Sequence, residues 1–153
     1  MILHAGLIAL RYQEIWRGVL LQGPSGAGKS DLALRALQKG FRLVADDRTL
    51  VFRSAGALFG RAPGALAGKL EVRGLGIGQR TPLPWVQIML AVRCAASPEG
   101  LERWFENQTQ SWLDVSVDTL DLWPFAASAP EKLIAAIEWL GTRREDGYQP
   151  PQP

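Results

Sequence analysis

Short apolar runs separated by polar or glycine-rich segments make up the first third of the chain. Runs at residues 4–10 and 18–22 predict two β-strands, and the polar segment 11–16 between them predicts a connecting loop. Residues 41–45 form another short run of the buried type, and residues 49–53 predict a further strand. The pattern therefore indicates several short strands close together in the sequence.

Two segments carry apolar residues at helical spacing instead. After the glycine-rich segment that follows the second strand, residues 31–39 have a continuous apolar face, and Gly40 follows as a stop. Near the C-terminus, residues 132–140 show the same spacing behind Ser128–Glu131, which has the form of a capping box with proline in the first turn. Both segments are predicted to be α-helices that pack against a sheet.

The middle of the chain is less regular. Residues 60–84 are dense in glycine and proline, which favours ordered loops over helices or strands. Residues 85–94 predict a buried strand, and the alternating pattern of 112–122 predicts a strand with one wet face. We therefore expect one α/β domain over residues 1–142, followed by a flexible polar tail at 143–153.

Composition narrows the class of protein. The chain has 153 residues, of which 47% are apolar, and its formal net charge is +2. This charge is too small to indicate a nucleic acid or an anionic membrane as partner. The single cysteine cannot form an internal disulfide, and the apolar runs are far shorter than the roughly 18 residues that span a bilayer. We expect a soluble, cytoplasmic globular protein that binds neither nucleic acid nor membrane.

The strongest chemical signal is the sequence between the second strand and the first helix. It satisfies the phosphate-loop pattern G-x-x-x-x-G-K-[ST] in the strand-to-helix context that the pattern requires. Glycines let backbone N–H groups turn towards phosphate oxygens, and the helix N-terminus adds partial positive charge. The predicted nucleotide-binding residues are Gly23, Pro24, Ser25, Gly26, Ala27, Gly28, Lys29 and Ser30.

Two adjacent carboxylates, Asp46 and Asp47, follow the strand at 41–45. In open α/β sheets, ligands bind beyond the carboxyl ends of parallel strands, which is where this pair is expected. One carboxylate could hold magnesium, directly or through water, while the other accepts a proton from an attacking hydroxyl group. A solvated turn is the alternative interpretation. The phosphate loop by itself does not distinguish between ATPases, nucleotide-dependent switch proteins and kinases.

Four segments together resemble a known family. Residues 23–30, 40–47, 60–63 and 70–77 are similar in order and spacing to the catalytic domain of HPr kinase/phosphorylase. That bacterial enzyme phosphorylates a serine of HPr, the phosphocarrier of the sugar phosphotransferase system. The resemblance covers about residues 4–80 and is greatest to the short form found in alphaproteobacteria. It implies a P-loop-containing mixed sheet with flanking helices, related to the P-loop fold of phosphoenolpyruvate carboxykinase.

The resemblance also implies roles for individual residues. ATP and Mg²⁺ are the implied cofactors and HPr is the implied protein partner. Lys29 would be catalytic, and Ser30 and Glu71 would hold magnesium. Asp46, from the pair of adjacent carboxylates described above, is a further candidate ligand. Asp47 would accept the proton of the target serine, and would donate it in the reverse, phosphorolytic reaction.

Residues 70–79 match the signature segment of the family, and the residues of interest there are Glu71, Arg73, Gly74 and Gly76. His4 corresponds to a family histidine that precedes the loop, although the spacing to the loop is longer here, as if 11–17 were an expanded turn. Arg103 is a candidate match to a catalytic arginine beyond the signature. A polar residue at a strand start and a surface arginine are the alternative interpretations of these two.

One family feature has no counterpart. Long members carry an arginine-rich loop with proline and glycine that is associated with dephosphorylation, and residues 120–132 contain nothing similar. Phosphorylase activity and hexameric assembly therefore stay open, although a homo-oligomer of unknown size is expected. Two other functions also stay open: a P-loop kinase of small molecules, and a non-catalytic module that senses nucleotides and signals to a partner.

Overall fold

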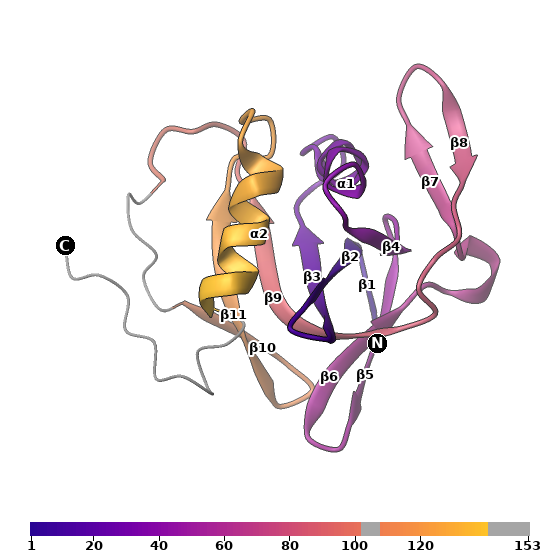
Figure 1. Ribbon diagram of the computed structural model, residues 1–153, viewed down its shortest axis with the longest axis vertical. Helices are drawn as coiled ribbons and strands as arrows, with labels where there is room; N and C mark the ends of the chain where they lie inside the picture. The colour runs from indigo at the N-terminus through magenta and orange to yellow at the C-terminus, as the bar shows by residue number, and fades with distance from the viewer. Residues whose placement is uncertain (102–107, 141–153) are drawn as a thin grey trace.

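The computed structural model describes residues 1–101 and 108–140, in which a mixed β-sheet carries two α-helices on one face (Figure 1). The strands are β1 (Ile2–Leu3), β2 (Ala5–Tyr12), β3 (Ile15–Gln22), β4 (Arg42–Ala45), β5 (Thr49–Ser54), β6 (Ala57–Arg61), β7 (Lys69–Val72), β8 (Gly76–Gln79), β9 (Val86–Cys94), β10 (Thr109–Trp112) and β11 (Val115–Leu122). The helices are α1 (Lys29–Leu37), α2 (Ala129–Leu140) and the short 3₁₀-helix η1 (Gly64–Leu66). The expected tail at 143–153 and Arg103 lie outside the described residues.

Strand β9 joins the parts of the main sheet. The strand order is β1-β5-β6-β9-β3-β2-β4, and β11 pairs with β9 and with β10. β9 is parallel to β3 and to β11, whereas the other pairs in this sheet are antiparallel. The predicted mixed α/β sheet is therefore confirmed. β7 and β8 form a separate two-stranded sheet.

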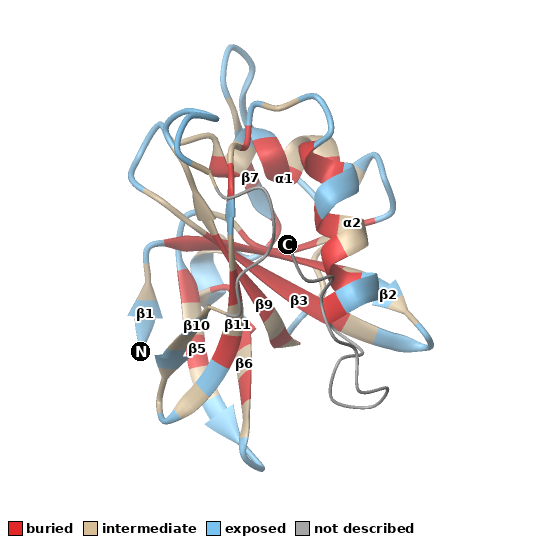
Figure 2. Cartoon of the chain, turned by 90° about the vertical axis from the view of Figure 1, so that its left-hand side faces the viewer, coloured by how far each residue is buried: buried red, intermediate tan, exposed pale blue. Residues whose placement is uncertain are grey.

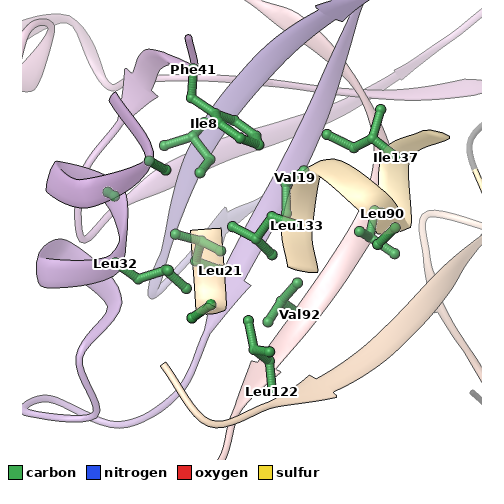
Figure 3. Packing of buried hydrophobic residues seen from close by; sticks show 14 of the residues in the cluster. Ile8, Val19, Leu21, Leu32, Phe41, Leu90, Val92, Leu122, Leu133 and Ile137 are labelled. Atoms are coloured by element: carbon green, nitrogen blue, oxygen red, sulfur yellow. The ribbon is translucent and has the colours of Figure 1, made fainter. Parts of the chain in front are cut away.

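Alternating residues of the central strands fill a core on each face of the sheet. Along β3, Val19 and Leu21 pack in the cluster that contains α1 and α2, whereas Leu20 packs in the cluster on the other face with β5 and β6. Figure 3 shows the helix-side cluster, and Figure 2 shows buried positions along β3, β9 and the inner sides of both helices. Because both faces are covered, these strands are almost continuously apolar.

The connection predicted at residues 11–16 is wrong. β2 and β3 form one long hairpin in which Arg11 pairs with Trp16, and only Gln13 and Glu14 lie outside the strands. Both turn residues have positive φ angles, 51° and 65°. Two successive left-handed residues match the twist of a hairpin, but sequences normally mark such turns with Asn-Gly or Asp-Gly. The expanded turn inferred at 11–17 is therefore absent from the described structure.

The prediction of loops throughout residues 60–84 is also wrong in part. The segment includes the end of β6 and the β7–β8 hairpin. Gly74, with a φ angle of 86°, lies in the turn of that hairpin, and Gly76, with a φ angle of 116°, is the first residue of β8 and pairs with Val72. The strands expected at 49–53 and 85–94 and both long helices are confirmed. No helix in the described residues is long and apolar enough to cross a membrane.

Several strands end at one edge of the sheet. Ala5 at the start of β2 pairs with Gln22 at the end of β3, and Ala45 at the end of β4 pairs with Leu7. β9 and β11 run parallel to β3 and finish at the same edge. The carboxyl end of β4 therefore lies near the phosphate loop as expected, although its neighbour β2 is antiparallel and not parallel. This edge positions the candidate site.

Candidate active site

The glycine-rich segment forms a tight turn between β3 and α1. The Ala27 N–H donates to Pro24 O at 3.0 Å, and α1 begins directly after Gly28. Gly26 and Gly28 have φ angles of 82° and 102°, which residues with a side chain rarely adopt. A Cβ on Gly28 would also lie 2.8 Å from the ring of Phe125. The sequence has glycine where this backbone requires it.

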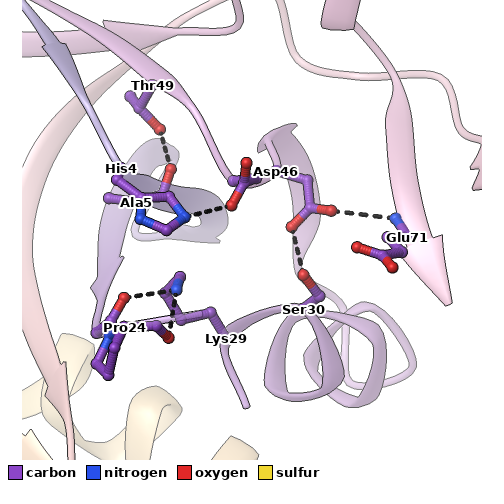
Figure 4. Close-up of polar contacts among 10 residues, drawn as sticks. His4, Ala5, Pro24, Lys29, Ser30, Asp46, Thr49 and Glu71 are labelled. Carbon is purple, nitrogen blue, oxygen red and sulfur yellow. Dashed lines mark hydrogen bonds and ion pairs between the residues drawn. The ribbon is translucent and has the colours of Figure 1, made fainter. Parts of the chain in front are cut away.

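Lys29 folds back onto the loop that precedes it (Figure 4). Only 7% of the surface of Lys29 is exposed, and its Nζ donates to Gly23 O at 2.6 Å and to Pro24 O at 3.0 Å. Within the described residues it forms no ion pair with a carboxylate. Burying an ammonium group that contacts only carbonyl oxygens costs free energy unless an anion neutralises its charge. The loop therefore fits a phosphate group.

Asp46 links three elements of the site (Figure 4). The Ser30 hydroxyl donates to Asp46 Oδ1 at 2.8 Å, and the backbone N–H of Glu71 donates to Oδ2 at 3.0 Å. Ser30 belongs to α1 and Glu71 to β7, so this one carboxylate, which follows β4, fastens both to the edge of the sheet. Asp46 thus fixes the positions of the two residues expected to hold magnesium.

Asp47 has a different partner. Its Oδ1 lies 2.5 Å from His4 Nε2, and both side chains are about half exposed. Asp47 has a φ angle of 63°, so the chain turns between the two carboxylates and directs them apart. Asp46 and Asp47 therefore contact different groups, and His4 lies beside the expected proton acceptor.

A cavity of about 280 Å³ lies over the phosphate loop. It is lined by Ser25, Gly26, Gly28, Lys29, Ser30, Asp31, Leu34, Asp47, Glu71, Val72, Arg73 and Phe125. A Cβ on Gly26 would lie 3.9 Å from the guanidinium of Arg73, so this arginine lies above the loop. The predicted Lys29, Ser30, Asp47, Glu71 and Arg73 thus meet around one space.

Other predicted residues lie outside the cavity lining. Asp46 and His4 contact lining residues but do not line the cavity themselves. Gly74 in the turn of the β7–β8 hairpin and Gly76 at the start of β8 are both exposed. Sequence reasoning missed Leu34 and Phe125, which are apolar and carry no motif. Only their place in the folded chain brings them to the phosphate loop.

The only cysteine lies behind the loop. A Cβ on Gly23 would be 3.2 Å from Cys94 Cβ. Burial raises the pKa of the Cys94 thiol to about 11, although the nearby Lys29 ammonium acts in the opposite direction. The thiol is therefore neutral at pH 7 and unsuited to act as a nucleophile.

The oxygen ligands around the cavity fit magnesium in the way expected for nucleotide sites. Among the described residues, no group of three or more His, Cys, Asp or Glu side chains could hold a metal ion. Mg²⁺ usually takes one or two protein oxygens and completes its shell with substrate phosphates and water. The Ser30 hydroxyl and the Glu71 carboxylate at one cavity wall fit that role.

A glycine-rich loop that closes over a buried lysine between a strand and a helix is typical of α/β proteins that bind phosphate groups. Within that class, sequence comparison assigns the family. Residues 3–81 match the HPr Serine kinase C-terminal domain, and the chain belongs to this family.

Individual relatives agree with the assignment. The chain is 36% identical over 105 residues to an HPr kinase/phosphorylase from Clostridium tetani, which covers 69% of this chain and 34% of the relative. A Clostridium beijerinckii HPr kinase/phosphorylase is 48% identical over 105 residues, 69% of this chain and 35% of its own length. The chain thus spans about a third of the length of these relatives.

The fold also matches a solved structure. The Hpr(Ser) kinase/phosphatase from Coxiella burnetii superposes with a TM-score of 0.78 at 20% identity, over 95% of this chain and 99% of that one. At this level of identity the likeness concerns the fold. It extends the similarity beyond residue 81, where the family match ends.

Proposed function

We propose that this chain is the catalytic domain of an ATP-dependent protein kinase that phosphorylates a serine of the phosphocarrier HPr and thereby regulates the sugar phosphotransferase system. The observation that carries the proposal is the cavity around which Lys29, Ser30, Asp47 and Glu71 meet. Phosphoryl transfer needs charge neutralisation, a positioned nucleophile and little covalent chemistry from the protein. These four side chains supply the charge neutralisation and the positioning of the nucleophile.

Each residue has a defined task in this mechanism. The loop N–H groups and Lys29 bind the phosphates, and Ser30 and Glu71 hold magnesium, which neutralises charge on the terminal phosphate oxygens when bound. Asp47 accepts the proton of the serine hydroxyl as its oxygen bonds to phosphorus and the bond to the leaving ADP oxygen breaks.

His4 acts on Asp47 in this scheme. His4 Nε2 contacts Oδ1 of Asp47, whereas Oδ2 of Asp47 has no hydrogen bond within the described residues. Oδ2 is therefore the oxygen that we propose takes the proton of the serine hydroxyl. Arg73 above the loop adds positive charge towards the transferred group. A catalytic role for Arg103 stays a prediction.

Several finer features of the proposal rest on the family resemblance alone. They are a homo-oligomeric state and a kinship with the short alphaproteobacterial form, whereas a cytoplasmic location is proposed from the single cysteine and the short apolar runs. Phosphorolysis would use the same residues in reverse, with Asp47 returning its proton. Residues 120–132 supply no arginine-rich loop for it, so we propose the kinase reaction as the main activity.

The test is transfer to HPr. The purified chain is incubated with Mg-ATP and HPr from the same cell, and phosphoserine is sought by mass spectrometry, with Lys29→Ala as the matched inactive variant. We expect phosphoserine on HPr with the wild type and its loss with the variant. ATP binding without transfer would contradict the kinase and favour the nucleotide-sensing module.

A further inference from the structure

Phe125 is an exposed aromatic side chain in the wall of the cavity. It follows β11, and 52% of its surface is exposed, although it is one of the larger apolar residues of the chain. Leu34 of α1 and Val72 of β7 line the same cavity. The cavity therefore combines a polar part around Lys29 with apolar side chains that the phosphoryl chemistry does not use.

The segment that carries Phe125 is fastened to the phosphate-loop helix. The Arg35 guanidinium donates to the carbonyl oxygens of Pro124 and Ala126, the residues on either side of Phe125. Arg35 is itself held by Asp31 at 2.9 Å. Two hydrogen bonds that bracket one residue fix its backbone, so the ring position is set by α1.

The ring also lies directly against the loop. A Cβ on Gly28 would be 2.8 Å from Phe125 and 3.0 Å from Pro124, so a side chain at position 28 would displace both. Other exposed large apolar side chains, such as Trp139, do not line the cavity. Phe125 thus differs from a singly exposed surface residue, which would need no explanation.

We propose that Phe125 is the surface on which the base of the bound nucleotide packs. The inference rests on the proposed nucleotide-binding function and adds a specificity residue to it. Nucleobases have apolar faces that stack on aromatic rings, and removing such a ring weakens binding measurably for any base. Phosphates held by Lys29 and the loop leave the base to reach beyond them, and the apolar wall beside Gly28 matches its chemistry.

The test separates the base from the phosphates. Binding of Mg-ATP and of magnesium tripolyphosphate, which lacks a base, is measured by isothermal titration calorimetry. The proteins are the wild type, Phe125→Ala, Phe125→Trp and, as matched control, Trp139→Ala. From the range of about 1–3 kcal/mol for base stacking, Phe125→Ala is expected to weaken Mg-ATP binding about 5- to 150-fold. Tripolyphosphate binding should change less than about twofold, and Phe125→Trp should retain ATP affinity.

The outcomes distinguish this inference from the function on which it rests. If Phe125→Ala binds Mg-ATP like the wild type, or weakens both ligands equally, the stacking role is wrong while nucleotide binding stands. If the wild type binds neither ligand, the proposed function fails and the role of Phe125 fails with it. A loss of ATP affinity in Trp139→Ala as large as in Phe125→Ala would also contradict the inference.

Discussion

Replacing Asp46 tests the arrangement that holds the two candidate magnesium ligands together. Its carboxylate accepts hydrogen bonds from the Ser30 hydroxyl at 2.8 Å and from the Glu71 N–H at 3.0 Å. Asp46→Ala removes both and leaves α1 and β7 without their shared partner. The expected result is a less stable domain in which β7 is no longer fixed at the cavity wall.

The expected loss in the free energy of unfolding follows from the two hydrogen bonds that Asp46 accepts. Hydrogen bonds to charged groups contribute about 1.5–3 kcal/mol each, and Asp46 is only half-buried, so the lower value applies and the loss is about 3 kcal/mol. For a domain of this size, that corresponds to a fall in Tm of about 6–12 °C. Asp46→Asn keeps the shape, because its amide can accept from Glu71 and donate to Ser30, and it should lose only about 1 kcal/mol.

Urea unfolding followed by circular dichroism gives the free energy of unfolding for each variant. Glu99→Ala is the matched control, because this exposed carboxylate has no hydrogen bond or ion pair within the described residues. The order of stability should be wild type and Glu99→Ala, then Asp46→Asn, then Asp46→Ala. If Asp46→Ala unfolds at the same urea concentration as Glu99→Ala, the structural role assigned to Asp46 is wrong.

Two further predictions concern packing and protonation. A Cβ on Gly18 would lie 2.6 Å from the backbone oxygen of Gln87, so Gly18→Ala should destabilise the domain by about 1–3 kcal/mol in urea unfolding. Gly64→Ala, with open space at that position, should change little, and equal midpoints for the two variants would refute the packing argument. Because burial raises the pKa of Cys94 to about 11, its alkylation by iodoacetamide should keep accelerating about tenfold per pH unit between pH 7 and 10. A plateau of the alkylation rate near pH 9 would contradict the raised pKa of Cys94. Lys29→Ala should raise the pKa of Cys94 further, because the substitution removes a positive charge.

Local patterns sufficed for the parts of the site that are contiguous in sequence. The phosphate loop, with Lys29 and Ser30, occupies consecutive residues whose backbone requirements select glycine. Helix periodicity identified α1, and an apolar run followed by two carboxylates identified the end of β4. In each case the signal and the structure lie within the same few residues, so the sequence alone could reveal them.

Features that depend on distant contacts were not predictable in the same way. The β2–β3 hairpin turns at Gln13 and Glu14, which carry no glycine signal, and the β7–β8 hairpin uses glycines that normally indicate loops. Phe125 follows β11 in the sequence but lies at the cavity, where Arg35 of α1 binds the carbonyl oxygens on either side of it. The different hydrogen-bond partners of Asp46 and Asp47 likewise come from α1, β7 and the N-terminal segment.

The most direct test of the account compares binding and transfer in Asp47→Asn. The affinity for Mg-ATP and the single-turnover rate of HPr phosphorylation are measured on the same preparation of this variant. The account predicts near-normal affinity with a transfer rate lowered about 10²- to 10⁴-fold, the usual contribution of a proton acceptor. A near-normal transfer rate would contradict the assignment of Asp47 and, with it, the proposed mechanism.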